Sequence, residues 1–215
     1  MNGPPGGSRR LGAVSLDLER ARAVAHAHAA KINDVLLTVV AGGVRELLIG
    51  RKEPVSGLEL RVSVPANLRR SGARDLGNAV GAMVVGLPAG EPDAVRRLER
   101  IAAATRAAKV AQHPAYVEGS TAGLAAAGLL VPFARRQRLV NLFVTNVPGP
   151  AAALYLLGAR IDRLMPIVMP AGNVTVIVAA LSYRGQLDVV VDAAGCDDLG
   201  VLVAGMERAW AALAA

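Results

Sequence analysis

Cysteine, histidine and aromatic residues are scarce in this chain, and each shortage excludes or disfavours a class of function. Cys196 is the only cysteine among 215 residues, so an internal disulfide or a metal site built from several cysteines is excluded. Aromatic residues make up 3% of the sequence, whereas proteins that bind single-stranded nucleic acid stack bases on aromatic rings. We therefore expect no nucleic-acid partner.

Long uninterrupted apolar runs are also missing. The two best candidates for a membrane span cover residues 119–133 and 164–183, and proline interrupts both. The first ten residues lack the apolar core of a signal peptide. We expect a cytoplasmic location, with peripheral contact to a membrane or lipid droplet left open.

What the chain does have is apolar and basic. Hydrophobic residues make up 53% and charged residues 19%, a balance typical of a folded domain rather than a disordered chain. The formal net charge is +7, which would suit an acidic ligand or a lipid surface. A general arginine and alanine bias explains the same charge, and we favour that explanation.

The hydrophobic periodicity predicts alternating helices and strands. Helices are expected over residues 17–30, 33–48, 91–111, 119–137 and 198–214, and strands over 11–16, 58–64, 78–87, 139–147, 159–168, 174–183 and 186–192. Pro65 is expected to end its strand, and Arg184-Gly185 to form a hairpin turn. The prediction is an α/β (α+β) domain over residues 11–215, with a mixed β-sheet flanked by helices, after a flexible linker over residues 1–10.

The helix expected from residue 33 is the most apolar of the set. Asn33 is predicted to be its N-cap, because an asparagine side chain accepts from free N–H groups of the first turn. Asp34 follows where the helix dipole favours negative charge. These two residues either cap a core helix or, in addition, border an active site.

No complete catalytic or metal-binding set is found in the sequence. His26 and His28 are two residues apart on a predicted helix, so they point to different sides and cannot share a metal as an i, i+4 pair would. His113 precedes a proline at an expected helix end. Cys196 lies beside Asp197 and Asp198, whose negative charges should raise its pKa rather than activate it.

Several short motifs, in their order along the chain, resemble the C-terminal half of the bacterial wax ester synthase/diacylglycerol acyltransferase (WS/DGAT) family. The most specific are Asn33-Asp34-Val35 and Asn146-Val147-Pro148-Gly149-Pro150. Weaker matches are Asn2-Gly3-Pro4 with Arg9-Arg10, Pro65 through Arg69, Gly77-Asn78, and Leu181 through Leu187.

The resemblance implies one lobe of a fold shared with chloramphenicol acetyltransferase and the condensation domains of peptide synthetases. Acyl-CoA and a fatty alcohol or diacylglycerol would meet in a tunnel between two lobes, with acyl-CoA as substrate and no cofactor. The base would be the second histidine of an HHxxxDG motif in the N-terminal lobe. This sequence contains neither a His-His pair nor an Asp-Gly pair, so it offers no catalytic residue of that kind.

By the same resemblance, eight residues are expected to line the tunnel, although each also has a structural explanation. They are Asn33, Asp34, Pro65, Arg69, Asn78, Asn146, Pro148 and Gly149.

Four functions remain open at this point. The first is an acyltransferase lobe that is active only with an N-terminal lobe, carried by another chain or lost by truncation, and it predicts an exposed apolar face for that partner. The second is a non-catalytic acyl- or lipid-binding or interaction domain, either monomeric or formed by self-association. A gene fragment, or an independent enzyme that uses His28 or His113, is less favoured.

Overall fold

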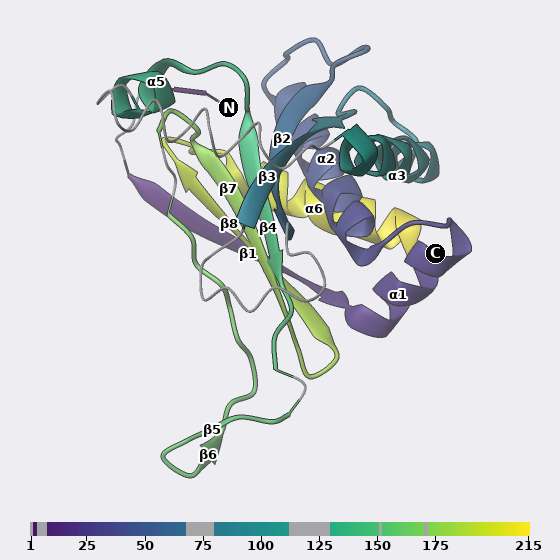
Figure 1. Ribbon diagram of the computed structural model, residues 1–215, viewed down its shortest axis with the longest axis vertical. Helices are drawn as coiled ribbons and strands as arrows, with labels where there is room; N and C mark the ends of the chain where they lie inside the picture. The colour runs from purple at the N-terminus through teal and green to yellow at the C-terminus, as the bar shows by residue number, and fades with distance from the viewer. Residues whose placement is uncertain (1, 4–7, 68–79, 112–129, 151, 170–171) are drawn as a thin grey trace.

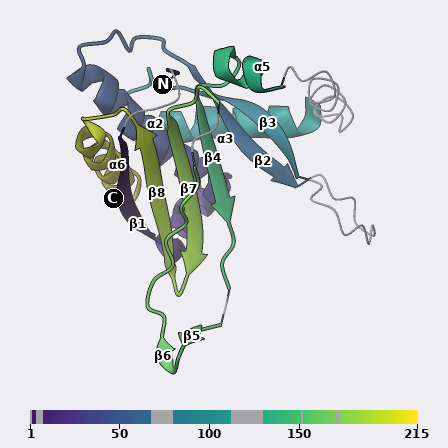
Figure 2. The ribbon, with the colours of Figure 1, turned by 90° about the vertical axis from the view of Figure 1, so that its left-hand side faces the viewer.

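A six-stranded mixed sheet with its main helices packed on one face forms the body of the molecule (Figures 1 and 2). This arrangement is seen in a computed structural model that describes residues 2–3, 8–67, 80–111, 130–150, 152–169 and 172–215. The strand order is β1-β8-β7-β4-β2-β3. The predicted fold class, a mixed sheet flanked by helices, is confirmed.

The elements of this sheet come from both ends of the chain. The strands are β1 (Arg9–Asp17), β2 (Leu60–Asn67), β3 (Val80–Leu87), β4 (Leu142–Val147), β7 (Val176–Tyr183) and β8 (Gln186–Ala194), and a separate hairpin pairs β5 (Tyr155–Leu156) with β6 (Ala159–Arg160). The helices are α1 (Leu18–Ala27), α2 (Ile32–Gly50), α3 (Ala94–Ala111), α5 (Leu130–Arg136) and α6 (Leu199–Leu213).

Strand direction divides the sheet into two kinds of pairing. Strands β2, β4 and β7 are parallel neighbours, while β1, β8 and β3 pair antiparallel with theirs. The β7–β8 hairpin turns at Arg184-Gly185, as predicted, and both residues have positive φ angles of 48° and 80°. Two successive positive φ angles are typical of the tight turn that matches the twist of paired strands.

Helix α2 occupies the centre of the core. Every residue from Asp34 to Val44 is buried, because the sheet covers one side of the helix while α3 and α6 pack along the others (Figure 1). The approach of α6 is close: a Cβ on Gly205 would lie 3.0 Å from the Cα of Gly43. Glycine at these positions lets the two helix backbones touch.

Two expected boundaries are wrong. Helix α2 begins at Ile32 with Lys31 as its N-cap, so Asn33 is the second helical residue and does not cap the helix. Strand β2 does not end at Pro65 but continues to Asn67. Its pairing with β4 covers only Val62 and Ser63, and β3 alone is its partner beyond them. Proline is tolerated there because one side of the strand needs no N–H donor.

The strand predicted over residues 159–168 is also wrong. Only Ala159–Arg160 is a strand, and residues 161–169 have no regular structure. An apolar run forms a strand only where a neighbour pairs with it, and this run lies outside the six-stranded sheet. Of the helix expected over 119–137, the described part contains Leu130–Arg136.

Part of the expected linker is attached to the domain. Strand β1 begins at Arg9 rather than Leu11. The Nδ2 of Asn2 donates to the carbonyl oxygen of Val140 at 2.9 Å, and Asn141 donates to Oδ1 of Asn2 at 2.9 Å.

Replacing Gly43 by alanine should destabilise the fold. The new Cβ would lie 2.4 Å from Cγ of Met206 and 2.7 Å from the carbonyl oxygen of Leu202, which belongs to the α6 backbone and cannot easily move. Overpacking of this kind costs about 1–3 kcal/mol. Urea denaturation would measure the change in the free energy of unfolding.

Gly200→Ala is the matched control, because no atom lies within 4 Å of its Cβ position. We expect it to leave stability unchanged or raise it by up to about 1 kcal/mol, since alanine favours the helix. Equal stabilities for the two variants would contradict the close packing of α2 on α6.

Candidate functional site

The carboxyl ends of three parallel strands form one edge of the sheet. Strands β2, β4 and β7 are in parallel register, so they end on the same side. Pro65 lies near the end of β2, and Asn146 is the penultimate residue of β4. Pro148 and Gly149 follow β4 directly. Four of the residues predicted from the sequence therefore lie along one edge.

The N-terminus of α2 is directed toward that same edge. Arg51, just after α2, binds Asp198 at 2.6 Å, and Asp198 follows the end of β8. Because β8 runs antiparallel to β7, its end lies at the opposite edge, where the parallel strands begin. The first turn of α2, with Asn33 and Asp34, therefore faces the carboxyl-end edge.

Asp34 is a buried carboxylate with both oxygens occupied. Its side chain is 4% exposed. The backbone N–H of Lys31 donates to Oδ2 at 2.8 Å, and the hydroxyl of Thr105 donates to Oδ1 at 2.8 Å. The first bond closes the start of α2, and the second joins α2 to α3. Within the described residues, Asp34 fixes the helix at this edge rather than offering a free carboxylate.

Asn33 and Asn146 differ from Asp34 in this respect. Both are half-buried. Neither side-chain amide has a hydrogen bond to another residue in the part of the chain that the structure describes. An amide supplies both donors and acceptors, so these two positions have polar capacity that the described fold does not use.

Gly149 is required where the turn after β4 meets β7. Its N–H donates to the hydroxyl of Ser182 at 3.2 Å. A Cβ at this position would lie 1.9 Å from the carbonyl oxygen of Ser182, so any side chain would displace the turn. Pro148 and Pro150 flank it and are exposed. This close packing explains why glycine is needed at position 149. It gives no such reason for the two exposed prolines.

The other predicted tunnel residues and the histidines do not join this edge in the described part of the chain. Arg69, Asn78 and His113 lie outside the described residues. His26 is exposed on α1, as expected, and His28 is half-exposed at the C-cap of that helix. Among the residues that the structure describes, no three histidine, cysteine or acidic side chains gather as a metal site would require.

Cys196 does not have the character of a nucleophile. Burial raises the pKa of its thiol, and the adjacent Asp198 raises it further by hydrogen bond and charge. The Arg51 guanidinium opposes this effect, but its stronger partner is Asp198, whose pKa it lowers well below the usual range. The expected rise in the Cys196 pKa agrees with the structure, although burial is the larger cause.

An ionic cluster on the other face of the sheet was missed in the sequence. Asp188 on β8 is 1% exposed, and its Oδ1 accepts from the hydroxyl of Ser15 at 2.6 Å and from the guanidinium of Arg163 at 2.5 Å. Its Oδ2 is buried with no partner among the described residues. The signal that could have revealed it is a pair of acidic residues, Asp188 and Asp192, inside an otherwise apolar strand.

A long excursion between β4 and β7, residues 152–169, extends beyond the sheet, with β5 and β6 at its tip (Figures 1 and 2); we call it the arm. Tyr183 holds its base, accepting from the N–H of Leu154 at 2.9 Å and donating to the carbonyl oxygen of Ile161 at 2.9 Å. Large apolar side chains on the arm are exposed, namely Leu154, Tyr155, Leu156, Leu157, Met165, Ile167, Val168 and Met169. Leu157, at the tip, is 99% exposed.

A family model for the WS/DGAT C-terminal domain matches residues 76–214. The chain belongs to this family. A Mycobacterium tuberculosis (strain H37Rv) relative named as a diacylglycerol O-acyltransferase is 32% identical over 193 residues, covering 84% of this chain and 38% of the relative. The O-acyltransferase WSD of Acinetobacter baylyi is 30% identical over 192 residues, covering 85% of this chain and 41% of the relative. The resemblance inferred from the motifs is confirmed.

Solved structures agree with this assignment. The wax ester synthase/diacylglycerol acyltransferase from Marinobacter aquaeolei VT8 superimposes with a TM-score of 0.78 at 26% identity, covering 99% of this chain and 50% of that one. The PapA2 acyl transferase shares the fold at a TM-score of 0.62 and 16% identity. This WS/DGAT C-terminal domain thus spans half or less of the length of these relatives.

Among the helices of the described residues, none is both long and apolar enough to cross a bilayer.

Asp34 and Asn33 should respond very differently to substitution. Asp34→Ala removes the bond that closes α2 and the bond to Thr105, and loss of such a helix-start bond costs about 1–2 kcal/mol. Asn33→Ala removes no side-chain bond of the described fold, so we expect a change within about 0.5 kcal/mol. Thermal or urea denaturation would measure both.

Thr105→Val tests the link between α2 and α3. Because Asp34 and Thr105 are directly bonded, the double variant should be less destabilised than the sum of the two single variants. Strict additivity, or a large loss of stability in Asn33→Ala, would contradict these assignments.

Proposed function

We propose that this chain is the C-terminal lobe of an acyl-CoA-dependent O-acyltransferase that acts on a fatty alcohol or diacylglycerol. The main support is that the chain belongs to the WS/DGAT C-terminal domain family. Support comes from the relatives' names and from the chain's span of 38–50% of the length of the Mycobacterium tuberculosis, Acinetobacter baylyi and Marinobacter aquaeolei relatives above. The catalytic histidine would come from an N-terminal lobe that carries HHxxxDG.

The arm supports the same proposal. Monomeric proteins rarely expose many large apolar side chains together, and such patches are typical of interaction surfaces. The described part of this chain leaves the apolar side chains at the arm tip largely uncovered. An N-terminal lobe would remove them from water, at roughly 25 cal/mol per Å² of apolar surface buried.

In this proposal the chain's own residues position substrates rather than transfer protons. Asn33 and Asn146 lie toward the carboxyl-end edge with amides that the described fold leaves unused. They would hydrogen bond polar atoms of the alcohol or the thioester. Asp34, Pro65, Pro148 and Gly149 would shape the tunnel wall, and Arg69 and Asn78 would complete it. A histidine of the partner lobe would take the hydroxyl proton as that oxygen attacks the thioester.

Reconstitution tests the proposal. The chain is co-expressed with an N-terminal half of a WS/DGAT-family acyltransferase chosen because it carries HHxxxDG, and the mixture receives palmitoyl-CoA and hexadecanol or diacylglycerol. We expect ester product at least tenfold above the sum of the separate halves, and its loss when the second histidine of the motif is replaced by alanine. A stable complex that retains acyl-CoA without product would favour a non-catalytic acyl-binding domain. No complex and no product would contradict both.

The arm supplies a variant for this assay. Leu157→Asp places a charge at the tip of the arm and should weaken assembly at least tenfold, without lowering the melting temperature of the isolated chain. Val110→Asp is the matched control, because Val110 is 90% exposed and lies near the end of α3. Analytical ultracentrifugation measures assembly. Equal effects of the two substitutions would argue against the arm as the contact.

A further inference from the structure

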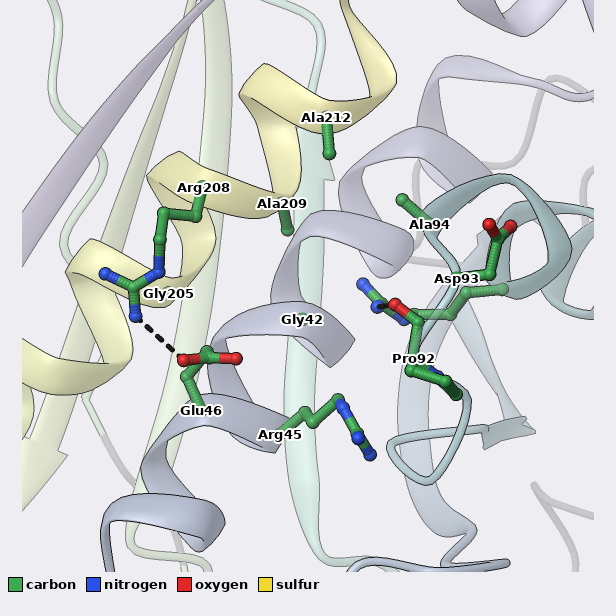
Figure 3. A pocket seen from close by; sticks show the side chains of 11 residues that line it. Gly42, Arg45, Glu46, Pro92, Asp93, Ala94, Gly205, Arg208, Ala209 and Ala212 are labelled. Carbon is green, nitrogen blue, oxygen red and sulfur yellow. Dashed lines mark hydrogen bonds and ion pairs between the residues drawn. The ribbon is translucent and has the colours of Figure 1, made fainter.

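A pocket of about 350 Å³ lies between α2, α6 and the start of α3 (Figure 3). Small residues leave the space open: Gly42 comes from α2, and Ala209 and Ala212 come from α6. Charged side chains surround this small-residue floor (Figure 3). The residues proposed to face the acyltransferase tunnel do not contribute to this lining.

Arg97 is the most deeply buried charge in the pocket lining. It is 3% exposed, and its guanidinium donates to the carbonyl oxygens of Glu91 at 3.1 Å and Pro92 at 3.0 Å. No carboxylate lies within ion-pair distance of it among the described residues. Burial lowers its pKa and the nearby Arg45 lowers it further, while the charges of Glu91, Asp93 and Glu46 oppose both effects. A buried cation with only carbonyl partners is costly, and an anion would relieve that cost.

Arg45 adds a second guanidinium to the pocket lining (Figure 3). It also bonds carbonyl oxygens, donating to Gly90 at 3.0 Å, and has no ion pair in the described part of the chain. Gly42 makes room for this arrangement, because a Cβ there would lie 2.7 Å from an Nη of Arg97. Arg45 and Arg97 therefore both line the pocket, and neither forms an ion pair with a carboxylate among the described residues.

The carboxylates of the pocket are already engaged. Glu46 accepts from Arg208 at 2.9 Å across the other wall (Figure 3). Asp93 accepts the backbone N–H of Arg96 at 2.8 Å, which caps α3. These bonds pair the acidic oxygens with other groups, although both carboxylates still raise the pKa of Arg97 through their charge. The pocket lining carries three arginines and two acidic residues, so its net charge is positive.

We propose that this pocket binds a small phosphate group, with Arg45 and Arg97 as its cationic ligands. Guanidinium groups present planar pairs of N–H donors that match the oxygens of phosphate. The volume accommodates the group together with a short organic substituent. The proposal goes beyond the acyltransferase function and does not depend on it, since it concerns a different face of the domain and uses this chain alone.

Titration of the 215-residue chain with inorganic phosphate tests the site. Isothermal titration calorimetry at pH 7 and low ionic strength should show saturable binding with one site per chain. Arg45→Gln should weaken it at least tenfold. Arg96→Gln removes the same charge from an exposed neighbour on α3 outside the pocket, and should change the dissociation constant less than twofold.

A second variant reduces the volume of the pocket without changing the charges that line it. Ala212→Leu keeps every charge and fills the pocket from an exposed position at the end of α6, so it should weaken phosphate binding at least tenfold while the domain remains folded. This variant keeps the test valid if Arg45→Gln does not fold. Absence of saturable binding in the unmodified chain would overturn the proposal, and so would equal weakening by Arg45→Gln and Arg96→Gln.

The source of the phosphate is resolved by two further probes. Glycerol 3-phosphate represents a soluble phosphate ester, and phosphatidylcholine vesicles with or without phosphatidic acid represent a lipid headgroup. Competition between phosphate and glycerol 3-phosphate at one site, with no vesicle binding, identifies a free anion. Vesicle binding that requires phosphatidic acid and is lost in Arg45→Gln identifies a headgroup. Vesicle binding unaffected by Arg45→Gln would contradict a role for this pocket in lipid contact.

Discussion

The burial of α2 on nearly all sides is the constraint on which the rest of the structure depends. An apolar helix enclosed by a sheet and two other helices must bring its neighbours to short range. Gly43 and Gly205 permit this, because they let α2 and α6 touch backbone to backbone. Larger residues at these positions would separate the two helices and shift α2 relative to the sheet.

Because α2 is enclosed, the polar groups buried around it need hydrogen-bond partners. Asp34 meets this demand through Lys31 and Thr105, and the hydroxyl of Thr38 donates to the carbonyl oxygen of Asp34 at 2.7 Å. These bonds set the position of the α2 N-terminus relative to α3. They also hold Asn33 at the carboxyl-end edge of the sheet, where Asn146 is the penultimate residue of β4. The buried carboxylate therefore orders the proposed substrate edge.

Sequence patterns predicted the helices and strands that are determined by residues close together in the chain. The β7–β8 hairpin followed from apolar strands around Arg184-Gly185. The helix expected from residue 17 is α1, which Asp17 caps by accepting from the N–H of Arg20. Motif order predicted the family, and the comparison confirmed it. The roles of Asn33, Asn146 and the other expected tunnel residues stay predictions.

Features set by distant parts of the chain could not be predicted in this way. Pro65 continues a strand because β4 pairs with only part of β2, a fact of tertiary pairing. The run over residues 159–168 has the composition of a strand but no neighbour in the sheet. The contact between Arg163 and Asp188 joins residues that only the folded arm brings together. In each case the deciding partner is remote in sequence.

The arm carries the exposed apolar side chains that a second lobe would bury. Hydrogen exchange of the arm, measured by mass spectrometry with and without an HHxxxDG-bearing N-terminal half, tests this most directly. The account predicts strong protection of backbone amides between Leu154 and Met169 on mixing, with the exchange of buried α2 unchanged. Unchanged exchange along the arm, under conditions where the N-terminal half is folded and in excess, would contradict the claim that this domain is one lobe of a two-lobed acyltransferase.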